Sequence, residues 1–164
     1  MKDSKKDILY KADKKNRANL SFLGICFSLF TFIIAIRSEI LQDNYFVALQ
    51  LTLAIPLFLS SMFARIKLGY TKRYKMWDSF GFVTFLVGYS FLISTIGILL
   101  SSGVDILLGM IFFGLNILVA CIYSILEVIE NKDKLKSRML KDLFFIIMLV
   151  IFGILPSLGI LVWS

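Results

Sequence analysis

The chain has 164 residues, of which 59% are hydrophobic, and it carries a net charge of +7 without any histidine. Soluble domains are about half apolar, so this composition argues against a soluble enzyme or a soluble nucleic-acid-binding domain. The basic residues cluster at the ends of long apolar segments, which is typical of membrane proteins that contact anionic lipid headgroups.

Five apolar segments without a charged residue follow one another along the chain. A helix needs ~20 apolar residues to cross the ~30 Å hydrocarbon core of a bilayer, and each segment approaches or exceeds that length. The expected spans are 20–36, 45–64, 79–100, 106–126 and 143–163. The sequence therefore predicts an all-α, polytopic membrane helical bundle of about five transmembrane helices, formed by one membrane domain over residues 1–164.

The basic N-terminal segment 1–19 precedes the first span. A cleaved signal sequence is the alternative interpretation, but the charged leader is long and Ala35-Ile36-Arg37 makes a poor cleavage site. We therefore expect a retained span behind a basic cytoplasmic segment. This segment is a candidate contact for anionic lipid or for a partner protein. The residues proposed for that contact are Lys5, Lys6, Lys11, Lys14, Lys15 and Arg17.

The loops between the spans differ sharply in their basic residues. Segments 1–19, 65–78 and 127–142 hold seven, five and five Lys or Arg, whereas the two remaining loops hold only Arg37. The positive-inside rule places the basic side in the cytoplasm, so we expect the N-terminus there and the C-terminus outside. The residue usage is typical of an AT-rich bacterial genome, which makes the plasma (inner) membrane of a bacterium the expected location.

Four aspartates stand just before a span, namely Asp43, Asp78, Asp105 and Asp142. We expect each to cap a helix, because a carboxylate there accepts hydrogen bonds from unpaired N–H groups at the positive end of the helix dipole.

Segment 101–105 predicts a tight outer turn and hence a helical hairpin of the third and fourth spans. Pro56 and Pro156 are expected to kink the second and fifth spans.

The third and fourth spans carry the most polar intramembrane residues. On the fourth span, helical spacing brings one set onto a single face: Gly109, Asn116, Ala120, Tyr123 and Glu127. The third span has two faces of small residues, one formed by Gly81, Thr84, Gly88 and Thr95 and the other by Ser90, Ser94, Gly97 and Ser101. We interpret these faces as helix-packing seams, within the chain or between subunits, which place the third span at the centre of the bundle. The alternative is a pore-lining or ligand-facing strip.

The residues that build catalytic, cofactor or metal sites are sparse in this sequence. Histidine is absent, and the two cysteines, Cys26 and Cys121, lie far apart inside apolar segments. Neither an acid–base pair, a metal-ligand pattern nor a phosphate-binding loop is recognisable. We therefore expect no catalytic residue, no metal and no cofactor. An intramembrane lipid-modifying enzyme is the least favoured function.

The sequence predicts a small, non-enzymatic integral membrane protein that acts by assembly with itself or with a partner protein. Components of envelope-sensing, immunity and phage-defence systems act in this way. The expected partners are a bilayer with an anionic inner leaflet and a second copy or another membrane or cytoplasmic protein, with no nucleic acid. The alternative is an oligomeric ion channel or small-solute transporter lined by the third and fourth spans, although spans without mid-depth charge disfavour proton-coupled transport.

Overall fold

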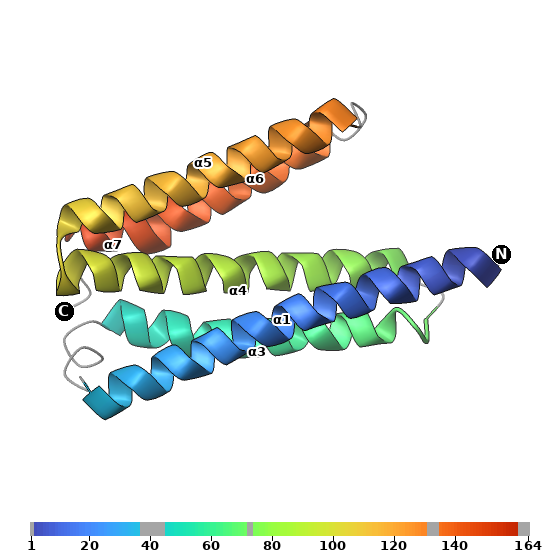
Figure 1. Cartoon of the computed structure of the whole chain (residues 1–164), viewed down its shortest axis with the longest axis horizontal. Coiled ribbons are helices and arrows are strands. Elements are labelled where there is room, and N and C mark those ends of the chain that lie inside the picture. The colour runs from blue at the N-terminus through green and yellow to red at the C-terminus, as the bar shows by residue number, and fades with distance from the viewer. Residues whose placement is uncertain (1, 37–44, 72–73, 131–134, 161–164) are drawn as a thin grey trace. The chain divides into compact units, whose positions relative to one another are not determined.

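The computed structural model describes residues 2–36, 45–71, 74–130 and 135–160, and within these ranges it contains helices and no strand (Figure 1). The helices in chain order are α1 (Lys2–Ile36), α3 (Tyr45–Lys67), α4 (Tyr74–Gly103), α5 (Ile106–Glu130) and α6 (Leu135–Leu149), followed by a π-helical segment (Val150–Ile154) and the short α7 (Leu155–Ser157). The all-helical prediction is confirmed for this part of the chain.

Five of the described helical stretches are long and apolar enough to cross a membrane, which confirms the predicted number. They are Ala12–Ala35, Tyr45–Lys67, Tyr74–Gly103, Ile106–Glu130 and Arg138–Ser157. Most helices extend beyond the apolar segments into the charged residues beside them. Lys, Arg and Glu are good helix formers, so the helical backbone continues after the apolar pattern has ended.

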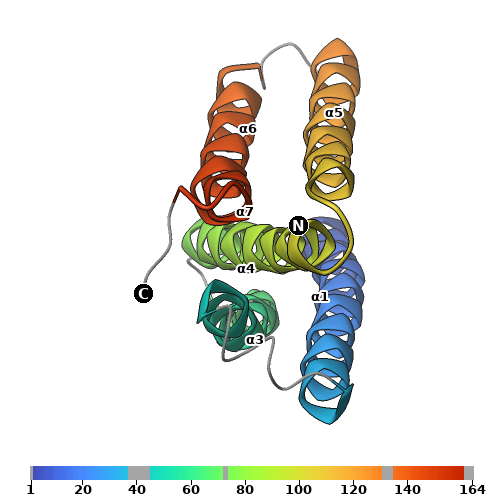
Figure 2. The ribbon, with the colours of Figure 1, turned by 90° about the vertical axis from the view of Figure 1, so that its left-hand side faces the viewer.

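The chain forms two compact units. The first contains α1, most of α3 and the first half of α4, up to Tyr89. The second contains the second half of α4, from Ser90, together with α5, α6, the π-helical segment and α7. In the second unit, α5 and α6 run side by side (Figure 2). The prediction of a single membrane domain stays a prediction.

An aromatic cluster joins the three helices of the first unit. The ring of Phe22 on α1 lies 5.8 Å from that of Phe58 on α3, and 5.7 and 5.3 Å from those of Phe85 and Tyr89 on α4. Phe58 is fully buried. Ring pairs at such distances add about 0.5–1.5 kcal/mol each beyond the area that they bury, so this cluster is a main contact of the unit.

Glycines on α4 bring it close to α3. A Cβ atom added at Gly81 would lie 3.0 Å from the Cβ of Ala64, and one at Gly88 would lie 3.2 Å from the Cβ of Leu57. Thr84, on the same face, is buried. This face therefore packs against a neighbouring helix, as the packing interpretation of the small residues predicts.

The second half of α4 packs against α5 and the π-helical segment through the ring of Phe113. This buried ring occupies the space that a side chain would need at Gly97 on α4 and at Gly153 in the π-helical segment. Ser101 on α4 lies against Gly109 on α5 in the same close manner. More than half of the most apolar stretch of α4 is buried, against a third or less in the other four helices.

Pro156 explains the irregular end of the last span. A proline lacks the N–H that would bond the carbonyl of Phe152, and its ring would also meet that carbonyl in a regular helix. The backbone instead widens over Val150–Ile154, and Leu155 N–H donates to the carbonyl of Val150, five residues earlier. The structure thus places a π-helical segment just before Pro156, while the kink expected there stays a prediction.

The last helix ends earlier than the expected boundary at residue 163. Gly159 adopts a φ of +71°, which favours glycine. Its N–H donates to the carbonyl of Pro156 at 3.0 Å, and Ile160 N–H donates to that of Leu155 at 3.1 Å. This paired closure is a Schellman motif, which satisfies the last carbonyls and stops the helix. Residues 161–164 lie outside the described residues.

The aspartate caps were predicted correctly at one position and wrongly at two. Asp105 accepts a 2.8 Å hydrogen bond from Leu107 N–H at the start of α5, which confirms its role as a cap. Asp78 and Asp142 lie inside α4 and α6, because these helices already begin at Tyr74 and Leu135. Asp43 lies outside the described residues.

The contact of Gly97 with Phe113 can be tested by substitution. Gly97→Ala places a methyl group against the Phe113 ring, and we expect it to lower the free energy of unfolding in detergent by roughly 1–3 kcal/mol. Gly114→Ala is the matched control, because a Cβ atom there meets nothing within 4 Å and alanine favours the helix. Equal stabilities of the two variants would contradict the packing.

Candidate functional site

The predicted strip on the fourth span lies at the edge of the buried side of α5. Gly109 is buried against Ser101 of α4, and Ala120 is half-buried. Asn116, also half-buried, donates from Nδ2 to the carbonyl of Phe112 at 2.9 Å, one turn earlier in the same helix. Gly109 and Asn116 are thus used in contacts that α5 makes with α4 and with its own backbone.

The end of this strip is tied to α6 by Arg138. The Arg138 guanidinium pairs with the carboxylate of Glu127, and both side chains are largely buried. The same guanidinium lies 5.4 Å from the ring centroid of Tyr123, a cation–π distance. Tyr123 and Glu127 therefore belong to one contact between α5 and α6, in which Arg138 is the residue that sequence reasoning missed. An acidic residue at the end of one span and a basic residue at the start of the next were the available signal.

The second polar face of α4 is enclosed within the second unit. Ser90 and Ser94 are fully buried, and Gly97 lies under the Phe113 ring. The hydroxyl oxygens of Ser94, Ser101 and Ser124 are buried and have no hydrogen-bond partner among the described residues. Small hydroxyl residues of this kind allow helices to approach closely in a membrane.

The basic N-terminal segment is part of α1, which runs without a break from Lys2 to Ile36. Lys5, Lys6 and Lys11 lie in this helix, and their side chains lie outside the described part. Lys14 is exposed. The remaining two candidates make ion pairs: Lys15 with Asp78 at 3.2 Å and Arg17 with Asp13 at 3.0 Å. The segment is therefore a direct continuation of the first span.

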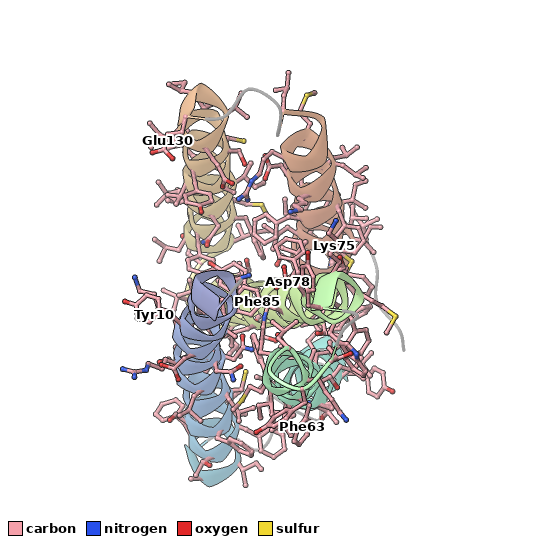
Figure 3. The ribbon with its side chains drawn as sticks, turned by 90° about the vertical axis from the view of Figure 1, so that its right-hand side faces the viewer. Tyr10, Phe63, Lys75, Asp78, Phe85 and Glu130 are labelled. Atoms are coloured by element: carbon pink, nitrogen blue, oxygen red, sulfur yellow. The ribbon has the colours of Figure 1, made fainter. Side chains whose placement is uncertain are left out.

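Asp78 is the centre of a charge cluster that joins all three helices of the first unit. It lies on α4 (Figure 3). Its carboxylate accepts from Lys15 of α1 and from Arg65 of α3. The Arg65 side chain is only 3% exposed, whereas that of Asp78 is 48% exposed. Removing a buried arginine from water is costly unless a carboxylate pairs with it. The negative charge of Asp78 therefore offsets the positive charge of Arg65, which helix packing has buried.

A chain of buried hydrogen bonds lies beside this cluster. Asn19 Nδ2 on α1 donates to Ser61 Oγ on α3 at 2.9 Å, and Ser61 Oγ donates to the carbonyl of Gly81 on α4 at 2.6 Å. Both side chains are buried. Such bonds between membrane helices contribute about 0.6–2 kcal/mol each. Sequence reasoning missed this network, because the partners are 20 and 42 positions apart.

Many polar groups of the described residues thus lie where helices meet. The ion pairs among the described residues form three groups, centred on Asp78, on Glu127 with Arg138 and on Asp13 with Arg17. In the same part of the chain, no group of three His, Cys, Asp or Glu side chains suits a metal ion. The arrangement is suited to holding helices in register.

No protein-family model, curated protein or solved structure matches the chain.

Asp78 and Asp13 offer a matched pair of substitutions. Asp78→Asn leaves the buried Arg65 without its carboxylate, so we expect it to lower the free energy of unfolding by roughly 1–3 kcal/mol, less than for a fully buried pair. Asp13→Asn removes a pair whose partners are both exposed and should cost under about 1 kcal/mol. Chemical unfolding in detergent micelles measures both. A larger loss for Asp13→Asn would contradict the assigned role of Asp78.

Proposed function

We propose that the chain is an integral membrane protein of the bacterial inner membrane, with its N-terminus in the cytoplasm and its C-terminus outside. Five helices of spanning length and composition support insertion. In the first unit, Lys15 stands near the start of the spanning stretch Ala12–Ala35 of α1, Arg65 near the end of α3 and Asp78 near the start of α4. Their ion pairs bring these helix ends together, which agrees with spans that alternate in direction.

The orientation can be tested with single cysteines in a Cys26→Ala, Cys121→Ala background. Val104, in the expected outer turn, and Tyr70, after α3, are 69% and 87% exposed. We expect a membrane-impermeant thiol reagent to label Val104→Cys in intact cells and Tyr70→Cys only after lysis. The reverse pattern would overturn the orientation.

We further propose that the protein acts non-enzymatically, by assembly with its own copies or with a partner protein. The observation that supports this most is the use of the small and polar residues of the helices. Gly97 and Gly109 serve contacts within the second unit, while Asn19 and Ser61 serve contacts within the first. Side chains used in this way build a stable helical scaffold, which is what an assembling component of a sensing, immunity or defence system requires.

Assembly predicts a native complex larger than one chain. We expect mass measurement after gentle extraction from membranes to return a homo-oligomer or a complex with a co-purifying protein. Extraction into lipid nanodiscs without detergent controls for dissociation during solubilisation. A chain that is monomeric and alone under both conditions would contradict the proposal.

An oligomeric channel or small-solute transporter is the second candidate. The buried hydroxyl oxygens of Ser94, Ser101 and Ser124 favour it, since hydroxyls without a partner can solvate a permeating ion. The channel predicts a flux through reconstituted vesicles that Asn116→Leu changes while the helical content stays constant. Vesicles without flux under ion and solute gradients would remove this candidate.

A further inference from the structure

The charged residues described in the first unit all belong to one end of it. They stand at the start of α1, at the end of α3 and at the start of α4, and the Asp78 ion pairs join these three helix ends. Over the described residues 2–36, 48–71 and 74–89, ten of them are basic and four are acidic. This end of the unit therefore carries a net positive charge.

Three exposed lysines at this end have no acidic partner among the described residues: Lys14 on α1, Lys67 on α3 and Lys75 on α4. We name them the unpaired lysines. The two acidic side chains that the structure describes here, Asp13 and Asp78, are engaged by other basic residues, and Asp78 is shared by two of them. The positive charges of the unpaired lysines are therefore available to an anionic partner.

The unpaired lysines stand at the depth of lipid headgroups. Lys67 follows the second apolar segment by three residues, whereas Lys75 and Lys14 precede the third and the first by four and six residues. At 1.5 Å per residue, these intervals are about 5, 6 and 9 Å. The headgroup layer on each side of the hydrocarbon is roughly 5–8 Å thick, and a lysine stem can extend along a helix to place its ammonium group there.

Lys14 and Lys67 stand above exposed apolar side chains of their own helices. Ile25 and Phe32 follow Lys14 by three and five whole turns, so they share its face of α1, and they are 44% and 59% exposed. Phe63, one turn before Lys67, is 65% exposed. Exposed apolar side chains on a membrane helix contact acyl chains. The ammonium groups above them are therefore placed to meet the headgroups of the same lipids.

Each unpaired lysine has an exposed tyrosine within four residues of it. These tyrosines are Tyr10, Tyr70 and Tyr74, with 67%, 87% and 44% of their surfaces exposed. Tyr10 points away from α3 and α4 (Figure 3). Tyrosine is enriched where a membrane helix meets the headgroup layer, because its ring is apolar and its hydroxyl forms hydrogen bonds. The tyrosines thus support the same depth for the lysines.

We propose that the unpaired lysines bind the headgroups of phospholipids with a net negative charge and hold these lipids around the first unit. The inference rests on the proposed insertion into a membrane. A lysine ammonium offers three N–H donors to phosphate oxygens, and an anionic headgroup has no choline group to compete for them. An acidic segment of a partner protein fits less well, because it would have to displace the lipids that already occupy this layer.

The preference for anionic lipid can be measured with spin-labelled lipids. The purified chain is reconstituted into phosphatidylcholine vesicles that contain a trace of labelled phosphatidylglycerol or labelled phosphatidylcholine, and electron spin resonance gives the fraction of each label held at the protein surface. We expect the wild type to hold more of the phosphatidylglycerol label. The triple variant Lys14→Gln, Lys67→Gln, Lys75→Gln should lower this preference roughly threefold or more.

The matched control removes the same charge from the same end of the chain. The variant Lys2→Gln, Lys5→Gln, Lys6→Gln changes three positions of α1, of which the last lies fourteen residues, or roughly 21 Å, before the first apolar segment. It should leave the preference nearly unchanged. Replacing the unpaired lysines by arginine should also preserve it. An equal loss in the control and in the glutamine variant of the unpaired lysines would overturn the inference.

The two labels separate this inference from the proposed function. A wild-type chain that holds neither label overturns membrane insertion together with the inference. A chain that holds both labels equally overturns the inference alone. Because the preference is a ratio, a partly unfolded variant lowers both labels without changing it.

Ionic strength provides a second measurement that requires no variant. The Debye length falls to about 3 Å in 1 M salt, so we expect the preference of the wild type to be largely lost there. A preference that persists in 1 M salt would contradict binding through exposed lysines.

Discussion

Close approach of neighbouring helices to α4 is the constraint on which the rest of the structure depends. In each unit a glycine on α4 removes the side chain that would hold a partner away: Gly81 and Gly88 admit α3, and Gly97 admits the ring of Phe113. Once helices lie this close, polar atoms on facing surfaces meet, and the bond from Ser61 to the Gly81 carbonyl is one result. In hydrocarbon, no water is present to form hydrogen bonds with buried polar groups. A span can therefore tolerate a polar residue only where a neighbouring helix lies close enough to bond it.

The sequence predicts the number of helical stretches of spanning length well, because a segment able to cross a bilayer must have a minimum length and an apolar composition. It also identifies the small-residue faces of α4, since their spacing is a local property of one helix. The ends of the helices are harder, because charged residues continue a helix as readily as they end one. Asp78 illustrates this: the aromatic and basic residues before it are already helical, so its carboxylate pairs with Arg65 instead of capping.

Contacts between distant positions could not be predicted from the pattern. The pairing of Lys15 with Asp78 spans 63 positions and depends on how α1 is rotated and shifted against α4. No local pattern of residues shows that register. For Glu127 and Arg138, the charges at neighbouring span ends indicated a pair but did not identify which residues would meet. The π-helical segment before Pro156 is a similar case, since a proline predicts a distortion but not which hydrogen-bonding pattern absorbs it.

The unbroken course of α1 has a mechanical consequence. At 1.5 Å per residue, its 35 residues form a rod of about 50 Å, longer than the ~30 Å hydrocarbon core. In the proposed orientation, roughly 20 Å of this rod stands in the cytoplasm without a hinge between it and the span. A force applied to the basic end would therefore tilt or rotate the whole helix, and the movement would reach the outer leaflet. The Lys15–Asp78 ion pair would hold the helix at the membrane surface, so the helix would pivot there.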